Sequence, residues 1–485
     1  MSAAAHTLAL SGLDAIPVQV EAYLHPLHGD AFEPLVVTGL SETESRETKV
    51  RVRSALQALG VDLVRGVTVT VTPAGQRAGG AADLTIAVAV LAAMGAIPAA
   101  SLEGTWIVGE LSLTGAVRPV RGVLPVLLAA RKAGVKRVIV PAGNAAEAAA
   151  VDGIDARVAA TLEAVVEHLR GTQALPVAQG MAFVPPVTSA DMADVRGQPV
   201  ARRALEIAAA GGHGLLLVGA PGAGKTMLAR RLSTILPELT RDESVEVSAV
   251  HSVAGILPDA GLVTARPFRA PHHTVSDAGL VGGGNPARPG EVSLASGGVL
   301  FLDELAEFRR SALDALREPL DTGTATVRRG DVQASFPARP LVVAATNPCP
   351  CGYAGDPSGR CRCGAERVQA YRARVAAFAG RFDLQITLPP VDFAALRAEP
   401  AGESSATVRA RVTAARERAG RRGAPAPATA LERVARTIAD LDGSEDVLAC
   451  HTSEARLFVG GEAGRVQCPL CGQRVAGVCG CGVAP

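Results

Sequence analysis

The chain has 485 residues, which is enough for roughly three domains at about 150 residues each. Its 48 lysines and arginines balance 47 aspartates and glutamates, so composition gives no reason to expect a polyanionic partner, and any contact with nucleic acid must come from local patches. The uncharged run 84–100 is too short and too interrupted for a membrane span, and the start lacks the features of a signal peptide. We expect a soluble, cytoplasmic protein with no membrane contact, whose nine cysteines are thiols or metal ligands rather than disulfides.

The first region, residues 1–172, alternates patterns typical of strands and of helices. Residues 67–72 alternate valine and threonine, as a half-exposed strand does, and residues 41–58 and 123–133 have helical spacing of apolar side chains. We therefore expect a compact domain of strands and helices here. A proline-rich linker over residues 173–190 is expected to follow it.

A glycine-rich turn lies between an apolar strand pattern and a helix pattern in the second region. Its residues are Gly219, Ala220, Pro221, Gly222, Ala223, Gly224, Lys225 and Thr226. The glycines let backbone N–H groups face phosphate oxygens, Lys225 reaches the β- and γ-phosphates, and Thr226 is placed to ligate Mg²⁺. A glycine-rich loop that matches by chance is the alternative, and the flanking strand and helix disfavour it. The motif predicts an ATP-binding site with Mg²⁺.

Two further apolar strands end on residues suited to hydrolysis. One ends on Asp303 and Glu304, which would hold the Mg²⁺ shell and polarise the attacking water, although solvated acids at a strand tip are the alternative. The other ends at Asn347, which would orient that water, although such an asparagine is often only a turn residue. Arg381 is the candidate arginine finger, acting on a neighbouring subunit; an ordinary surface ion pair is its alternative.

Several segments of this second region resemble the magnesium-chelatase-like AAA+ ATPases, and among them the ComM/YifB type. The segments are FRAPHHTVS at 268–276, RPGEVSLA at 288–295, FLDELAEF at 301–308, LREPL at 316–320 and NPCPCG at 347–352. In the first region, residues 109–120, 129–134 and 138–144 resemble the proteolytic domain of Lon-type proteases. The Ser-Lys dyad of those proteases is missing, because Asp83 falls near the nucleophile position and Leu124 near that of the lysine, so proteolysis is not expected.

The resemblance implies an α/β fold with an AAA+ P-loop core and a Lon-like α+β domain. It places the Lon-like domain at residues 1–172, the ATPase at 191–395, a shortened helical lid at 404–460 and a cysteine-rich tail at 461–485. It also implies a homo-oligomeric ring, a hexamer, that acts on DNA as a branch-migration motor in natural transformation. Two alternatives stay open: a remodelling ATPase that acts on a protein partner, as magnesium chelatase does, and a nucleotide-binding protein that lost turnover with its lid.

The resemblance further places an insertion (residues 262–290) and a hairpin (residues 324–336) at the ring pore. The candidate DNA contacts on these segments are the arginines Arg266, Arg269, Arg328 and Arg329. Basic side chains on pore loops track a phosphate backbone without reading bases, whereas pairing with acids such as Asp277 or Asp331 is the alternative. The adjacent His272 and His273 do not have the spacing of a metal site.

Two sets of cysteines have spacings that suit metal sites. The first set is Cys349, Cys351, Cys361 and Cys363; four thiolates on one short loop suit tetrahedral Zn²⁺, and free thiols are the alternative. The second set is Cys468, Cys471, Cys479 and Cys481 in the glycine-rich C-terminal stretch. This second set predicts either another Zn²⁺ site or a disordered tail.

Overall fold

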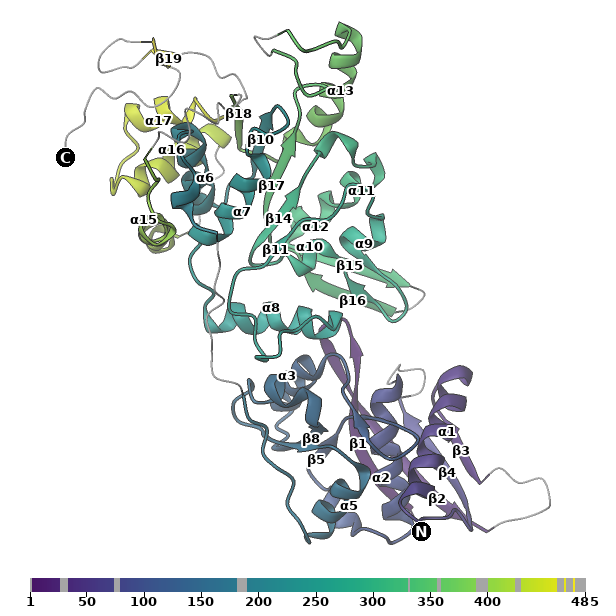
Figure 1. Ribbon diagram of the computed structural model, residues 1–485. Helices are drawn as coiled ribbons and strands as arrows, with labels where there is room; N and C mark the ends of the chain where they lie inside the picture. Colours follow the sequence, from purple (N-terminus) through teal and green to yellow (C-terminus); the bar gives the residue numbers. More distant parts are fainter. Residues whose placement is uncertain are drawn as a thin grey trace.

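The computed structural model describes residues 2–26, 34–73, 79–180, 190–329, 332–355, 359–389, 400–423 and 429–459, and the short pieces 466–467 and 474–475. We call residues 2–180 the N-terminal part, residues 190–389 the P-loop part and residues 400–459 the helical part. Figure 1 shows the N-terminal part below and the P-loop part above. Among the helices within these ranges, none is long and apolar enough to cross a membrane.

The N-terminal part is built on a mixed seven-stranded sheet. Its strands are β1 (Ser2–Ser11), β2 (Asp14–His25), β3 (Leu35–Thr38), β4 (Gly66–Thr72), β5 (Thr105–Ile107), β8 (Arg137–Pro141) and β9 (Asp155–Ala159), in the order β3-β4-β2-β1-β5-β8-β9. A small ladder pairs β6 (Glu110–Leu111) with β7 (Val117–Arg118). The helices are α1 (Glu42–Ala58), α2 (Asp83–Ala93), α3 (Val123–Lys132), α4 (Ala145–Ala148) and α5 (Leu162–Arg170).

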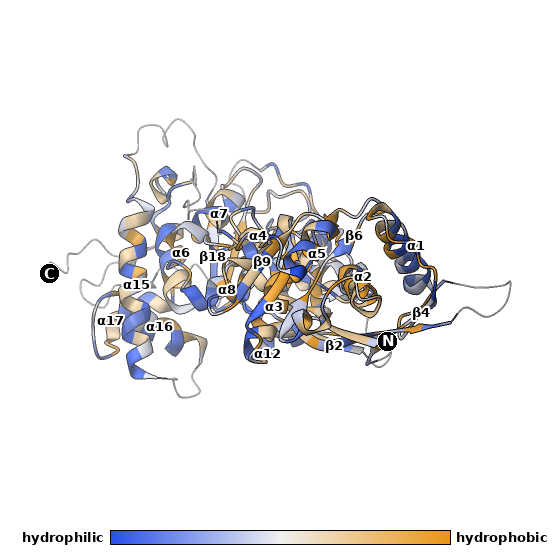
Figure 2. Cartoon of the chain, turned by 90° about the horizontal axis from the view of Figure 1, so that it is seen from below, coloured by the Kyte–Doolittle hydropathy of each residue, from blue (hydrophilic) through white to orange (hydrophobic). Residues whose placement is uncertain are grey.

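Local sequence explains these elements. Ser41 caps α1, because its hydroxyl accepts the Glu44 N–H while the Glu44 carboxylate accepts the Ser41 N–H. Every residue of α2 is buried, and Figure 2 shows this helix mostly in orange. The strand expected at 67–72 and the helices expected at 41–58 and 123–133 are confirmed within two residues at each end.

The P-loop part is built on a parallel five-stranded sheet. Its strands are β10 (Leu215–Gly219), β11 (Phe268–Arg269), β14 (Val299–Leu302), β17 (Leu341–Thr346) and β18 (Leu384–Leu388), in the order β11-β14-β17-β10-β18. All six residues of β17 are buried, as expected for a parallel strand with both faces covered. The helices are α6 (Pro199–Gly211), α7 (Lys225–Ile235), α8 (Arg241–Ala254), α9 (Asp277–Val281), α10 (Glu291–Leu294), α11 (Arg310–Ala315), α12 (Arg317–Thr322) and α13 (Ala365–Ala379).

Two hairpins and a helical part complete the described chain. The hairpins are β12 (Gly282–Gly283) with β13 (Arg288–Pro289) and β15 (Thr324–Arg329) with β16 (Val332–Pro337), and the second confirms the hairpin expected at 324–336. The helical part contains α15 (Ser405–Arg422), α16 (Ala430–Leu441) and α17 (Ala449–Ala455), which lie beside α6 in Figure 1. Of these, α17 was not predicted from the sequence. The short strands β19 (Val466–Gln467) and β20 (Arg474–Val475) pair with each other.

Helix α8 of the P-loop part packs against the N-terminal part. Figure 1 shows it lying between the two parts, above α3. The Ser252 hydroxyl donates to the buried Glu147 carboxylate at 2.7 Å, and the Gly122 N–H donates to the Ser252 carbonyl at 3.2 Å. A second contact joins the β1–β2 turn to hairpin β15–β16, where a Cβ added to Gly12 would lie 3.1 Å from the Ser335 carbonyl oxygen. Leu13 packs there against a cluster of buried side chains that includes Phe336.

Candidate ATP-hydrolysis site

The glycine-rich turn lies between β10 and α7, where the sequence predicts it. Gly222 and Gly224 have φ values of +81° and +88°, a left-handed backbone that other residues rarely adopt. Gly224 is the residue before α7, so the turn leads directly into the open N–H groups of the first helical turn. Such an end attracts phosphate oxygens through its N–H groups and through the positive end of the helix dipole.

Lys225 is the first residue of α7, directly after this turn. Its ammonium donates to the carbonyls of Gly219 and Ala220 at 2.6 and 3.0 Å and to the Asn347 side-chain oxygen at 3.0 Å. Burial lowers the pKa of Lys225, and the nearby charges of Asp303 and Glu304 oppose that shift. Asn347 follows β17, the strand beside β10, so the parallel sheet brings a residue 122 positions away to the lysine.

Thr226 and Asp303 also meet. The Thr226 hydroxyl donates to the Asp303 carboxylate at 2.9 Å, and both flank a cavity of about 370 Å³ that the glycine-rich turn, Glu304 and Asn347 also line. The hydroxyl and the carboxylate are oxygen ligands of the kind that Mg²⁺ prefers. The structure therefore brings together the predicted residues Lys225, Thr226, Asp303, Glu304 and Asn347; their catalytic roles stay predictions.

Glu304 has an unusual backbone conformation. Its φ is +55° and ψ +48°, in the left-handed region that costs a residue with a side chain free energy, and its N–H donates to the Asp303 carboxylate at 2.9 Å. The Glu304 carboxylate lies 3.1 Å from Nδ1 of His273. This contact was not predicted from the sequence. Its signal was the histidine pair in the FRAPHHTVS segment, which follows β11, the strand next to β14.

Arg381 lies at the end of α13, away from the lysine. It donates two hydrogen bonds to the Asp321 carboxylate, one of them at 2.7 Å, and these bonds raise the pKa of Arg381. The single chain thus shows the ion pair that the sequence analysis gave as the alternative. A role across a subunit interface stays a prediction.

The four cysteines of the 349–363 loop lie together. Their sulfur atoms are all within 4.8 Å of one another, and none of the four forms a disulfide. The Tyr353 N–H is the main cause that lowers the pKa of Cys351 to about 6. The arrangement can hold one metal ion. The four tail cysteines lie outside the described residues.

The candidate DNA contacts differ in accessibility. Arg266 has a side chain only 8% exposed, and it donates to the carbonyls of Pro237, Glu238 and Gly297 and to the Glu243 carboxylate. Arg269 makes a two-pronged pair with Glu291 at 2.6 and 2.7 Å. Arg328 is exposed on β15, and the side chain of Arg329 lies outside the described residues. Binding of DNA by any of the four stays a prediction.

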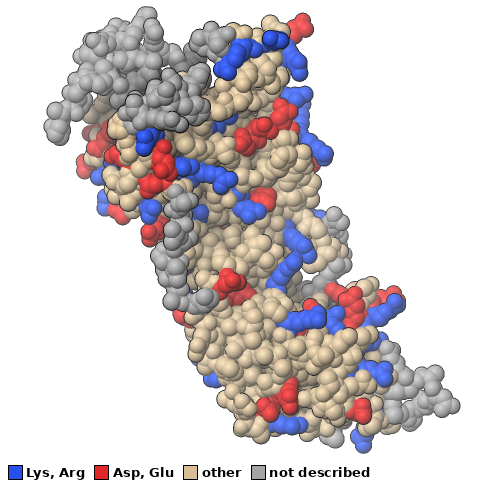
Figure 3. Space-filling model, viewed as in Figure 1, with Lys and Arg blue, Asp and Glu red and all other residues tan. Residues whose placement is uncertain are grey.

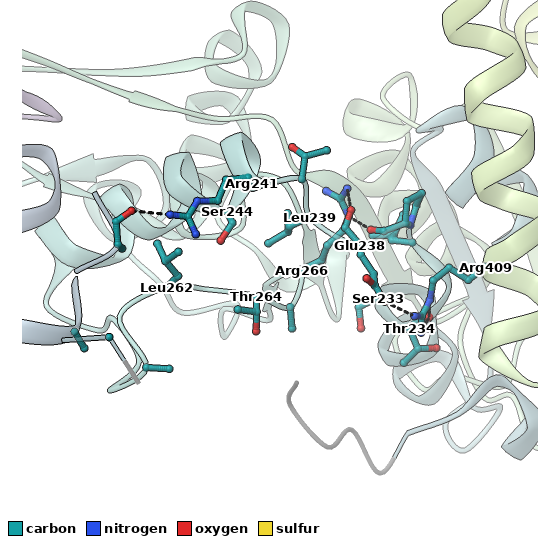
Figure 4. Close-up of a pocket in the computed structure, with 18 of the residues that line it drawn as sticks. Ser233, Thr234, Glu238, Leu239, Arg241, Ser244, Leu262, Thr264, Arg266 and Arg409 are labelled. Carbon is teal, nitrogen blue, oxygen red and sulfur yellow. Dashed lines mark hydrogen bonds and ion pairs between the residues drawn. The ribbon is translucent and has the colours of Figure 1, made fainter. Parts of the chain in front are cut away.

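Another cavity, of about 540 Å³, lies between the N-terminal part, the start of α8 and α15 (Figure 4). Its arginines are engaged: Arg409 donates to the Thr234 carbonyl at 2.9 Å, and Arg241 donates to the Ala150 carbonyl at 2.8 Å. The residues that the sequence predicts for ATP hydrolysis line the smaller cavity at the glycine-rich turn instead.

In the N-terminal part, the position that corresponds to the nucleophile of Lon-type proteases is buried away from solvent. Asp83 is completely buried, its carboxylate accepts from Arg51 at 2.5 Å and from Thr48 at 2.9 Å, and burial raises its pKa against those contacts. Leu124 is also fully buried. Neither residue offers a nucleophile or an activating base.

Comparisons with known proteins agree with this geometry. The family model "Magnesium chelatase, subunit ChlI" matches residues 191–396, and "Subunit ChlI of Mg-chelatase" matches residues 28–144. The chain is 44% identical to protein YifB of Salmonella typhimurium over 86% of its own length and 82% of that protein. It is 38% identical to competence protein ComM of Haemophilus influenzae over 93% and 96% of the two chains.

A partial match joins 27% of the chain, at 32% identity, to 13% of the archaeal Lon protease of Pyrococcus abyssi. This similarity agrees with the Lon-like segments noted in the sequence. The two long matches cover most of both chains, and the glycine-rich turn and acidic strand end belong to an AAA+ P-loop fold. The chain is therefore a member of the ComM/YifB family of magnesium-chelatase-like AAA+ proteins.

Proposed function

We propose that the chain hydrolyses ATP with Mg²⁺ and uses the energy to move DNA. The observation that carries this proposal is the meeting of Lys225, Thr226, Asp303 and Asn347 at the ends of three adjacent strands, with Glu304 beside them. Membership in the AAA+ family supports nucleotide and Mg²⁺ use. We place the activity in the cytoplasm, where ATP and reduced thiols are found together.

The proposed roles follow from position. Lys225 and the N–H groups of the turn hold the β- and γ-phosphates, while Thr226 and Asp303 hold Mg²⁺. Glu304 orients and polarises the attacking water, with Asn347 on its other side. Phosphoryl transfer needs positioned charge more than covalent chemistry, which is what this arrangement of side chains supplies.

We also propose that the chain works as a homo-oligomeric ring, a hexamer, in which Arg381 reaches the nucleotide of a neighbouring subunit. Arg381 is partly exposed and pairs with the exposed Asp321, so an exchange of Asp321 for a γ-phosphate does not require a buried charge to be uncovered. Residues 1–172 would be an inert Lon-like domain, 191–395 the motor and 404–460 the lid. Light scattering in the presence of ATP measures the ring size.

Two observations support DNA as the substrate. The first is the similarity to a protein named for competence. The second is the accessibility of basic side chains: Arg328 is exposed on β15, and Figure 3 shows Lys and Arg gathered over α13. The exposed arginines in and just before α13 are Arg362, Arg367, Arg372 and Arg374. Such a surface binds phosphates without base specificity.

The test is steady-state ATP hydrolysis by the full chain, alone and with single-stranded or branched DNA. Glu304→Gln is expected to lower turnover by about 10²- to 10⁴-fold, because it removes the proposed base. Glu307→Gln is the matched control, since Glu307 is exposed nearby but lies outside the cavity lining, and it should keep the parent rate.

A rate that DNA raises and Glu304→Gln abolishes supports the whole proposal. Turnover that DNA does not change would refute the DNA part and favour a protein substrate, as in a chelatase-like remodelling ATPase. ATP binding without turnover above the Glu304→Gln level would refute the motor and leave a nucleotide-binding protein.

A further inference from the structure

The four-cysteine loop lies next to the ATP site. It follows β17 directly: Asn347, which accepts the Lys225 hydrogen bond, is two residues before the buried Cys349. Only Pro348 separates Cys349 from Asn347, so the loop is joined to the nucleotide site by a single intervening residue.

The sulfur positions fit a single tetrahedral ion. A zinc ion with Zn–S bonds of about 2.3 Å places its four sulfurs about 3.8 Å apart. Here Sγ of Cys349 lies 3.3 Å from that of Cys351 and 3.8 Å from that of Cys361, and Cys351 lies 3.7 Å from Cys361. The Ala354 N–H also donates to the Cys349 sulfur at 3.2 Å, which favours the thiolate form that binds metal.

The same loop contacts the glycine-rich turn. Gly352 is buried with φ +86°, and a Cβ added there would lie 2.5 Å from Cδ of Pro221 and 3.8 Å from Cγ of Asn347. The Gly352 N–H donates to the Cys349 carbonyl at 2.9 Å, so the backbone that carries the first two cysteines is the backbone that touches Pro221. The cysteine loop thus lies against Pro221 of the phosphate-binding turn and continues directly from Asn347, the residue proposed to orient water.

We propose that one Zn²⁺ ion bound by Cys349, Cys351, Cys361 and Cys363 holds Asn347 and the glycine-rich turn in their hydrolytic positions, so that zinc occupancy controls ATP turnover. The proposal rests on the ATPase function proposed above. The ion takes no part in hydrolysis. It joins Cys349 and Cys351 to Cys361 and Cys363, and without it Gly352 loses the restraint that fixes it against Pro221.

The first experiment counts zinc by mass spectrometry of the metal in the purified full chain. It uses a background in which the four tail cysteines are serine, so that only the loop is measured. We expect one zinc per chain, no zinc in Cys361→Ser, and one zinc in Cys450→Ser, a matched control because Cys450 is an exposed thiol outside the cluster. Absence of zinc, or iron in its place, would overturn the metal assignment.

The second experiment measures the coupling. Cys361→Ser should lower ATP turnover by about 10- to 100-fold, because a misplaced orienting group is costly, while binding of a fluorescent ADP changes less than turnover does. Retained ADP binding shows that the variant is folded. A zinc-free variant that turns over ATP at the parent rate would overturn the coupling.

Two glycine substitutions test the contact between the cysteine loop and Pro221 while zinc stays bound. The Gly352→Ala variant should still bind one zinc but should hydrolyse ATP more slowly, because its new Cβ meets Pro221. The Gly355→Ala variant should keep both its zinc and the parent rate of ATP hydrolysis. Gly355 is the matched control: its φ is +82°, so an alanine there meets similar backbone strain, but no atom of the described residues lies within 4 Å of a Cβ added to it. Equal turnover in the two variants would overturn the proposal.

These results separate the two proposals. If the parent chain holds zinc but never hydrolyses ATP, the ATPase function fails and the zinc site stands. If ATP is hydrolysed at the same rate with and without zinc, the ATPase stands and the zinc coupling fails.

Discussion

The two halves of the molecule each contain an acidic residue near a site predicted from the sequence, and the surroundings of the two are opposite: Glu304 follows strand β14, whereas Asp83 begins helix α2. In the P-loop part, Glu304 is 54% exposed at its side chain and lies beside a cavity of about 370 Å³. In the N-terminal part, Asp83 is 0% exposed and its carboxylate is paired with Arg51. A carboxylate that is already satisfied and closed off from solvent has no capacity left for a substrate. The difference is one of accessibility: Glu304 can meet a ligand from solvent, whereas Asp83 is committed to Arg51 and Thr48.

The largest effect should come from the open site. Lys225→Ala removes the cation proposed to hold the phosphates, so ATP turnover should fall by about 10²- to 10³-fold. Lys132→Ala changes an exposed lysine on α3 of the N-terminal part and should leave turnover unchanged. Both are read by steady-state hydrolysis. Parent-level activity of Lys225→Ala would remove the basis for treating the two halves differently.

Substitution of the buried Asp83 should change the stability of the chain rather than its ATP turnover. Asp83→Ala removes the buried partner of the Arg51 guanidinium, which keeps only the exposed Glu47, and should lower the free energy of unfolding by about 3 kcal/mol in the first urea transition. ATP turnover under native conditions should not change. Asp152→Ala is the control, because that side chain is 89% exposed and its loss should cost less than about 0.5 kcal/mol. A loss of turnover without a loss of stability would contradict this assignment.

The same distinction between exposed and buried charged side chains applies to the arginines. Arg328→Ala, an exposed change, should weaken DNA binding a few-fold and reduce the slope of log affinity against log salt by about 1. Arg266→Ala should instead destabilise the chain, because it leaves three backbone carbonyls without a donor. Fluorescence anisotropy over a salt series, together with thermal melting, distinguishes the two. The reverse pattern would show that Arg266 reaches DNA.

The smallest effect concerns the contact between the two halves. Burial raises the pKa of Glu147, against hydrogen bonds from Ser252, Asn144 and the Leu124 N–H that lower it. The folded chain therefore keeps this proton at pH values where the unfolded chain has lost it, and the free energy of unfolding falls as pH rises from about 4.5 through the raised pKa.

Glu147→Gln has no proton to lose, so this component of the pH dependence should disappear. The measurement is urea unfolding at several pH values from 4.5 upward, where each unit of pKa shift is worth about 1.4 kcal/mol. Glu163→Gln, an exposed change on α5, should follow the parent curve. An unchanged slope in Glu147→Gln would show that Glu147 is ionised in both states.

The sequence predicted those elements and motifs whose residues are close together along the chain. The strand, turn and helix around Lys225 follow one another along the chain, so their pattern is complete in one segment. Spacing also predicted the grouping of the four loop cysteines. The contact of His273 with Glu304 was missed because it depends on the order of strands in the sheet, which local patterns do not contain. The burial of Arg266 was missed because its partners are backbone carbonyls, and these have no signature in the sequence.

Hairpin β15–β16 packs against the β1–β2 turn, and this contact matters for the design of truncated variants. Val327, Ala334 and Phe336 are buried in a cluster to which Leu13 contributes. A truncated chain that begins at the P-loop part would expose these side chains to water and invite aggregation. Loss of activity after such a truncation would therefore report a damaged hairpin as readily as a missing partner domain, and replacing Leu13 with a polar residue in the intact chain separates the two.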